Sequence, residues 1–156
     1  MQQQRPSIYR QLGGEDGISR LVDLFYDIIE QDPAAAALHM LHLDGHGVAH
    51  SRVEQTRFLM GFFGGPRLYV EFHGHSDVRA IHAHVAVTAE TRDIWIRSMD
   101  KAFDQTGLPL EVKKRGMTAL ATAARLVHDV NPLRNRDEEI EAGTARIHLS
   151  DQGTRF

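Results

Sequence analysis

The stretch GGEDGISRLVDLFYDIIEQDP, residues 13–33, decides the fold class. Its apolar residues recur at the spacing of one helix face: Ile18, Leu21, Val22, Phe25, Ile28 and Ile29. Asp16 is the expected N-cap of this helix. Asp32 ends it, because the residue before a proline, here Pro33, avoids the helical region. Tyr26 lies beside the apolar face, where its hydroxyl can reach over the edge of the core. The stretch therefore predicts an amphipathic helix.

Further helices are expected toward the C-terminus. After a turn around residues 44–47, the pattern predicts a helix over residues 49–63 and a short one near residues 75–83. Thr88 is the expected cap of the next helix, which Gly107 closes, and Pro109 begins the last long one. No convincing strand is present, so the sequence predicts an all-α protein.

The helix over residues 49–63 carries a graded stripe. It is polar at one end and apolar at the other, in the order Ser51, Gln55, Phe58, Leu59 and Phe62. Such a stripe suits a pocket with one polar and one apolar end. Gly64-Gly65-Pro66 ends the helix, and a loop is expected from there to Gly74.

The amino-acid composition limits which classes of protein are possible. The chain has 156 residues, of which 42% are hydrophobic and 25% charged, as in one globular domain. A net charge of −3 gives no electropositive surface for nucleic acid. No apolar run is long enough to span a membrane, and no apolar leader precedes the domain, so a cytoplasmic location is expected. The absence of cysteine excludes disulfides, iron–sulfur clusters and thiolate-bound haem.

Three segments are expected along the chain. Residues 1–7 are polar and predicted to form a flexible N-terminal tail. Residues 8–130 form the domain. Residues 131–156 open with Asn-Pro and carry many charges, which predicts a flexible or surface extension.

Histidine is unusually frequent. The chain has ten, and eight lie between His39 and His84. One run has the spacing of a single helix face, as the ligands of a hemerythrin-like di-iron site would: His39, His42, His46 and His50, with Glu54. Gly45 and Gly47 interrupt this run, so the other interpretation is a turn with solvated or locally bonded imidazoles.

His82 is a separate candidate. It lies among Val78, Ile81 and Val85, where it is either a core histidine bonded to a carbonyl or the axial ligand of a haem iron. Tyr26, His42, Gln55 and Trp95 could point with it into one cavity. Tyrosine and tryptophan there would donate hydrogen bonds to a bound diatomic ligand, or would be core aromatics with polar tips at the surface. Spacing alone leaves both alternatives open.

Several segments, taken in order, resemble the group II truncated, two-over-two haemoglobins. They are IYRQLGGEDGI at 8–18, LFY at 24–26, Phe58-Leu59 with GGPRLY at 64–69, Gly74-His75 through Arg79 to His82, and Arg92-Asp93-Ile94-Trp95 through Met99. The resemblance spans residues 8–106, with a spacing of thirteen positions from His82 to Trp95.

The resemblance implies a two-over-two helical sandwich around a b-type haem. It implies His82 as the iron ligand, Tyr26 and Trp95 as donors to the bound ligand, and Ser51 and Gln55 as further positions on the ligand side. The remaining cofactor contacts expected are Phe58, Leu59, Phe62, Val78 and Arg79, with Trp95. His42 matches an aromatic position of the family near the ligand, and His39 is the alternative.

One departure lies beside His82. Many members have arginine before this histidine, and the present chain has Ile81. Arg79 or His75 is therefore expected to contact a haem propionate instead.

The function implied is reversible binding and transport of O₂ and other small diatomic ligands or sulfide, by a monomer or homodimer without nucleic-acid or membrane partners. No residue is assigned as catalytic. Peroxidase-type or NO-dioxygenase activity with a reductase partner is an extension of the same chemistry. The alternatives are a non-haem, hemerythrin-like di-iron protein and a cofactor-free helical interaction domain.

Overall fold

The computed structural model describes residues 6–82, 85 and 87–128, and this part of the chain contains helices and no strand. In chain order the elements are α1 (Ile8–Leu12), α2 (Gly14–Gln31), the 3₁₀ turn η1 (Pro33–Ala35), α3 (Ala36–Asp44), α4 (Val48–Phe62), α5 (Leu68–His73), α6 (Val78–Ile81), α7 (Ala89–Thr106) and α8 (Leu110–His128). The predicted all-α class is confirmed.

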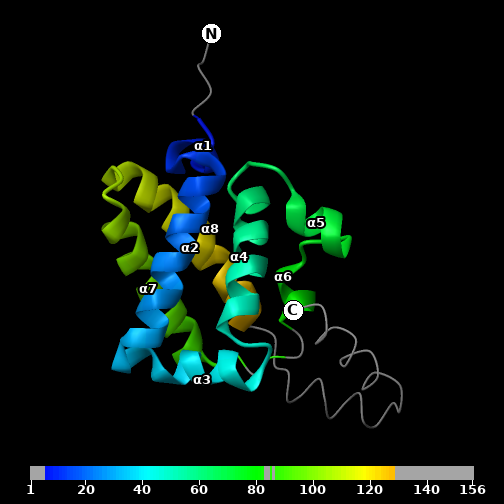
Figure 1. Cartoon of the computed structure of the whole chain (residues 1–156), viewed down its shortest axis with the longest axis vertical. Coiled ribbons are helices and arrows are strands. Elements are labelled where there is room, and N and C mark those ends of the chain that lie inside the picture. Colours follow the sequence, from blue (N-terminus) through cyan, green and yellow to red (C-terminus); the bar gives the residue numbers. More distant parts are fainter. Residues whose placement is uncertain (1–5, 83–84, 86, 129–156) are drawn as a thin grey trace.

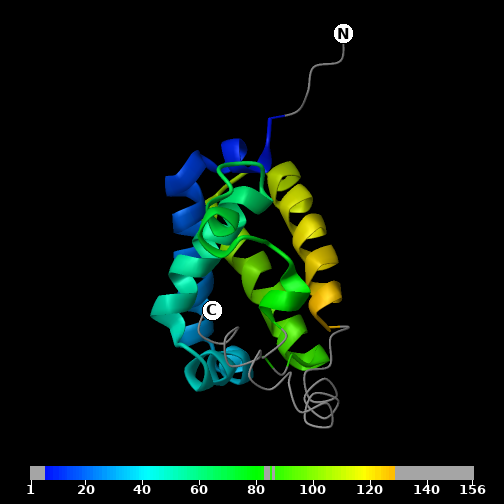
Figure 2. The same cartoon turned by 90° about the vertical axis from the view of Figure 1, so that its right-hand side faces the viewer.

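The four longest helices form two layers. Helix α2 packs against α4 in one layer and against α7 in the other, and α7 packs against α8 (Figure 1). Figure 2 shows α4 on the left and α8 on the right, with α6 against α8. Helix α3 crosses the end of the stack, in contact with α2, α4 and α7. This is the two-over-two arrangement that the sequence resemblance implied.

Helix α2 supplies the centre of the core. Its predicted apolar face is buried, with Ile18, Leu21, Val22 and Phe25 fully enclosed. The start of the helix differs from the prediction, because Gly13, with φ 102°, ends α1 and immediately caps α2. Asp16 is therefore not the N-cap; it lies in the first turn, where its carboxylate faces the positive end of the helix dipole.

Two helices that line the cavity, α3 and α5, were not predicted. Helix α5 occupies the segment expected to be a loop, and its Tyr69 is buried against the ring of Phe58, with centroids 5.6 Å apart. Helix α3 carries His39 and His42, where a turn was the expectation. Both helices are short, and α3 has no distinct apolar face, so periodicity gives little signal for either.

The residues expected to begin and end the later helices do so in the structure. Thr88 caps α7, and its side chain accepts from the backbone N–H of Thr91, which bonds back to form a capping box. Gly107 ends α7 with φ 73°, and Pro109 directly precedes α8. Ser7 caps α1, so it belongs to the domain rather than to a tail. The other predictions for the termini, over residues 1–5 and 131–156, lie outside the described residues.

None of the described helices combines the length and the apolar character that crossing a membrane requires.

Candidate functional site

A cavity of about 440 Å³ lies among the helices, a size usual for a cofactor or small-molecule site. Most of its wall is apolar, and residues from α2 through α8 contribute to it. The lining residues are Tyr26, Leu38, Leu41, His42, Gly45, His46, Ser51, Glu54, Gln55, Phe58, Leu59, Tyr69, Val78, Ile81, His82, Val85, Val87, Thr91, Arg92, Trp95, Leu120, Ala123, Ala124 and Val127.

Most of the residues singled out from the sequence meet in this cavity. They are Tyr26, His42, Ser51, Gln55, Phe58, Leu59, Val78, His82 and Trp95. Phe62 is placed elsewhere: it is 36% exposed and lines a shallow groove near α1 and α8, because the end of α4 reaches past the cavity. His39 and His75 are outside the cavity wall, and the side chain of Arg79 lies outside the described structure.

The imidazole of His82 is fixed by the backbone of α6. Its Nδ1–H donates to the carbonyl oxygen of Val78 at 2.8 Å. A carbonyl can only accept, so the neutral ring carries its proton on Nδ1 and its lone pair on Nε2. In metal-binding histidines, the ring nitrogen that does not bind the metal usually makes a hydrogen bond of this kind, which orients the ring. The apolar side chains of Val78, Ile81 and Val85 surround this part of the cavity.

Tyr26 is more deeply buried than its sequence position suggested. Its residue is 1% exposed, and its ring packs edge-on against Phe25, with centroids 4.9 Å apart. Burial raises the pKa of the Tyr26 phenol well above its usual value, against the smaller opposing effects of a side-chain hydrogen bond with Ser51 and the charge of Arg52. The hydroxyl therefore keeps its proton at neutral pH and can donate it in a hydrogen bond.

Trp95 and His42 complete the polar part of the wall. The indole of Trp95 packs against the Phe25 ring at 5.4 Å between centroids and is partly exposed to the cavity. The ring of His42 packs edge-on against Tyr26, also at 5.4 Å. Together with Ser51 and Gln55, these side chains place several hydrogen-bonding groups in an otherwise apolar space.

A cluster of polar side chains around Glu54, at the cavity wall, was not predicted from the sequence. Glu54 is 7% exposed, and its carboxylate pairs with Arg57 at 3.1 Å and with Nε2 of His73 at 2.5 Å. The His73 ring stacks on Tyr69, with centroids 4.4 Å apart, and burial raises the pKa of Tyr69 to about 12. The pairing of Glu54 with Arg57 could be inferred from their spacing on one helix. The contact with His73 could not, because it depends on how α5 folds back onto α4.

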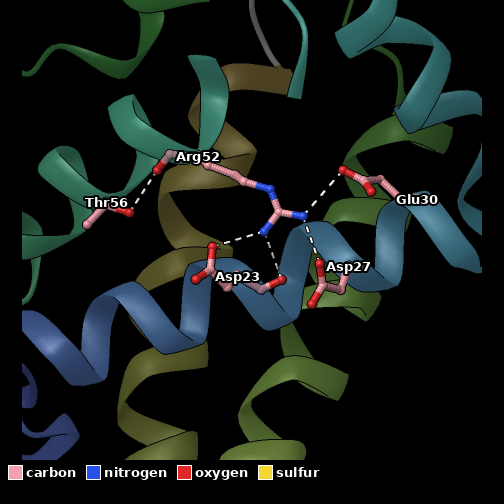
Figure 3. Close-up of polar contacts among 5 residues, drawn as sticks. All are labelled: Asp23, Asp27, Glu30, Arg52 and Thr56. Atoms are coloured by element: carbon pink, nitrogen blue, oxygen red, sulfur yellow. Dashed lines mark hydrogen bonds and ion pairs between the residues drawn. The ribbon is translucent and has the colours of Figure 1, made fainter. Parts of the chain in front are cut away.

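Arg52 ties α4 to α2 (Figure 3). Its guanidinium bonds Asp23 at 2.9 Å, Asp27 at 2.8 Å and Glu30 at 3.3 Å, three carboxylates on successive turns of α2. The same group lies 5.6 Å from the centre of the Tyr26 ring. These bonds hold the two helices that carry Tyr26 and Ser51 at a fixed separation, and we call this group the Arg52 clamp.

Arg52→Gln is expected to lower the free energy of unfolding by about 1–2 kcal/mol at low salt, because three neighbouring carboxylates lose a partly buried counter-charge. The difference from wild type should shrink in about 1 M salt, where exposed charges are screened. Urea unfolding at the two salt concentrations measures both. Lys101→Gln is the matched control, since it removes one exposed pair with Asp32. An equal loss in both variants would contradict the special role of the Arg52 clamp.

The histidine run does not form a metal centre in the described structure. His46 and His50 lie with ring centroids 5.0 Å apart, and the buried Nε2 of His50 has no hydrogen-bond partner among the described groups. Burial lowers the pKa of His50, so it is neutral at neutral pH. No set of three or more candidate ligands converges within the described residues. This geometry does not favour the di-iron alternative.

The donor set of the cavity fits a haem. A porphyrin needs flat apolar walls and one neutral imidazole nitrogen for its iron, and Phe58, Leu59 and His82 offer these. The donors of Tyr26 and Trp95 suit a small ligand that becomes partly negative when bound. Arg92, which lines the cavity, is a further cation that the sequence argument did not assign.

Known proteins give the same assignment. Residues 7–129 match the bacterial-like globin family. The group 2 truncated hemoglobin YjbI of Bacillus subtilis is 34% identical over 124 residues, which cover 80% of this chain and 89% of that protein.

Solved structures agree. The cold-adapted truncated haemoglobin of Pseudoalteromonas haloplanktis superposes with a TM-score of 0.73 at 29% identity, covering 78% of this chain and 97% of that one. The group II 2-on-2 haemoglobin of Agrobacterium tumefaciens gives a TM-score of 0.73 at 25% identity, covering 81% and 97%. The chain belongs to the bacterial-like globins, and among them to the group II truncated haemoglobins.

Proposed function

We propose that this protein binds a b-type haem through His82 and reversibly binds O₂ at the haem iron. Membership in the truncated globins makes it a haem globin that binds oxygen. The ligation by His82 and the roles of individual residues are the proposal. The observation that carries it is the hydrogen bond from His82 Nδ1–H to Val78, which orients the imidazole on the cavity wall in the way usual for a metal-binding histidine.

The residues that line the cavity have different proposed roles. Phe58, Leu59 and Val78 line the cavity, where they would hold the porphyrin and exclude water from it. Bound haem supplies an iron atom that shares electron density with O₂. Tyr26 and Trp95 would donate hydrogen bonds to a partly negative ligand in this site of low dielectric. The sequence has no cysteine for thioether links, so the haem is held without covalent attachment, as b-type haem is.

A relative supports the oxygen assignment. A truncated haemoglobin of Bacillus subtilis described as oxygen-avid superposes on this chain with a TM-score of 0.67 at 31% identity. Its fold covers 78% of this chain and 98% of its own. We extend oxygen binding to this protein because the present cavity holds donors that can stabilise bound O₂.

The test is a haem titration of the full chain, followed by absorption spectra. A saturable Soret band at one haem per chain is expected, and the ferrous form should change its spectrum with O₂ and return when O₂ is removed. A di-iron protein would show no Soret band. A chain that stays colourless with ample haem would contradict the proposal and favour a cofactor-free helical domain.

Redox activity is a second use of the same donors. Groups that hold O₂ can also polarise an O–O bond, so the proposal extends to peroxide reduction or NO dioxygenation with a reductase. Peroxide turnover with a reducing dye, and NO consumption with a reductase present, separate these activities from simple oxygen binding. Rates no higher than those of free haem would limit the function to ligand binding.

A further inference from the structure

His42 repeats the arrangement seen at His82. Both rings line the cavity, and both donate Nδ1–H to the backbone carbonyl four residues earlier, His42 to Leu38 at 2.9 Å and His82 to Val78 at 2.8 Å. Neutral His42 therefore has its proton on Nδ1 and its lone pair on Nε2. Nε2 lies on the side of the ring away from the Leu38 carbonyl. His42 thus brings an acceptor, not a donor, to the polar part of the cavity.

The surroundings keep His42 uncharged at neutral pH. Burial lowers the pKa of its imidazole, partly opposed by the hydrogen bond to Leu38 and assisted by nearby His39. The other titratable groups on the cavity wall come from several elements: Tyr26 of α2, His46 before α4, Glu54 of α4, Tyr69 of α5, His82 after α6 and Arg92 of α7. Tyr26 is in ring contact with His42 and stays a neutral phenol.

A neutral base among donors suits a different class of ligand from O₂. Tyr26 and Trp95 can hold an anion, but a ligand that arrives as a weak acid must first lose a proton. Neutral imidazole is the side chain best matched to that transfer near pH 7. The pocket thus combines a proton acceptor with donors for the anion that remains.

We propose that His42 is the proton acceptor for weak-acid ligands of the form HX, such as hydrogen cyanide, hydrogen sulfide and hydrogen peroxide. The H–X bond breaks and its electron pair stays on X. The proton forms a new N–H bond at Nε2 of His42, and the resulting imidazolium remains bonded to the Leu38 carbonyl. The anion X⁻ is held by hydrogen bonds from Tyr26 and Trp95. This inference rests on the haem site proposed above.

The test compares two ligands of the ferric holoprotein at pH 7. Hydrogen cyanide is undissociated there and must lose a proton, whereas nitric oxide has none to lose. In His42→Phe, which keeps an aromatic ring of similar shape, the association rate of hydrogen cyanide is expected to fall by roughly a hundredfold, the usual contribution of a positioned base. The association rate of nitric oxide is expected to stay the same.

His39→Phe is the matched control. It removes an imidazole from the same helix at a position outside the cavity wall, so the rate with hydrogen cyanide should change far less than in His42→Phe. His42→Gln is the second variant, in case phenylalanine disturbs α3, and it should show the same selective loss. An equal loss with both ligands would indicate altered access to the cavity and would overturn the proposal.

Two further readouts do not depend on binding rates. Nitrogen-15 NMR of the diamagnetic holoprotein should find His42 as the neutral Nδ1–H tautomer at pH 7. The other tautomer would remove the acceptor and contradict the inference. A ferric spectrum that changes coordination in His42→Phe would mean that His42 binds iron itself, which also overturns it. A protein without a haem spectrum would instead refute the proposed function.

Discussion

The His82→Ala variant is expected to be purified with little or no bound haem. Loss of an orienting partner alone commonly weakens metal binding by about 10–100-fold, so loss of the ligand itself should weaken haem affinity by at least ~100-fold. The neighbouring wall residues Val78, Ile81 and Val85 are apolar and offer the iron no replacement ligand on this side of the cavity. Haem content per chain, from the Soret band against protein absorbance, measures the effect.

Added imidazole provides the sharper part of this test. The alanine variant leaves a space of the size of the missing ring, so free imidazole should bind there and restore the haem spectrum. His39→Ala is the matched control, because His39 lies on α3 outside the cavity wall, and this variant should keep its haem. If His82→Ala retains haem with an unaltered spectrum, His82 is not the iron ligand.

His42 makes a double variant informative. Since it has the same backbone-fixed tautomer as His82, it is the residue best placed to bind iron in the alanine variant. Haem retained by His82→Ala with a changed spectrum, and lost when His42→Phe is added, would identify that substitution of ligands. Such a result would leave the assignment of His82 in the wild type intact.

Much of this site could be predicted because it lies on long amphipathic helices. The apolar face of α2 predicted that Tyr26 lies beside the core, and the graded stripe of α4 placed Ser51, Gln55 and Phe58 together. In each case the period of 3.6 residues relates positions far apart on the chain to one face.

The rest depends on contacts that no local pattern contains. Phe62 belongs to the same stripe as Phe58, yet the cavity ends before it, because α4 reaches past the cavity toward α1. The buried carboxylate of Glu54 pairs with His73, nineteen residues away on a helix too short to be predicted. Likewise, the depth of Tyr26 follows from the packing of α4 over α2, which the Arg52 clamp maintains.

Removing either predicted donor is expected to speed O₂ release. Tyr26→Phe deletes one hydroxyl from a fully buried ring and keeps its edge contact with Phe25, so the loss is chiefly that of a hydrogen bond. A hydrogen bond to a charged or partly charged acceptor contributes about 1.5–3 kcal/mol, which corresponds to at least a ~10-fold higher O₂ dissociation rate. Trp95→Phe should have an effect of the same size. Stopped-flow replacement of O₂ by carbon monoxide measures both rates.

Carbon monoxide dissociation distinguishes the loss of a hydrogen bond from a change in the shape of the cavity. It gains little negative charge when bound, so its dissociation rate should change far less than that of O₂ in either variant. Because burial keeps the Tyr26 hydroxyl protonated, the wild-type O₂ dissociation rate should also be flat through neutral and mildly alkaline pH. If both donors bond the same oxygen atom, the double variant should lose less than the sum of the two single losses. Unchanged O₂ dissociation rates in both single variants would show that neither side chain donates a hydrogen bond to the ligand, which would contradict the proposed roles of Tyr26 and Trp95.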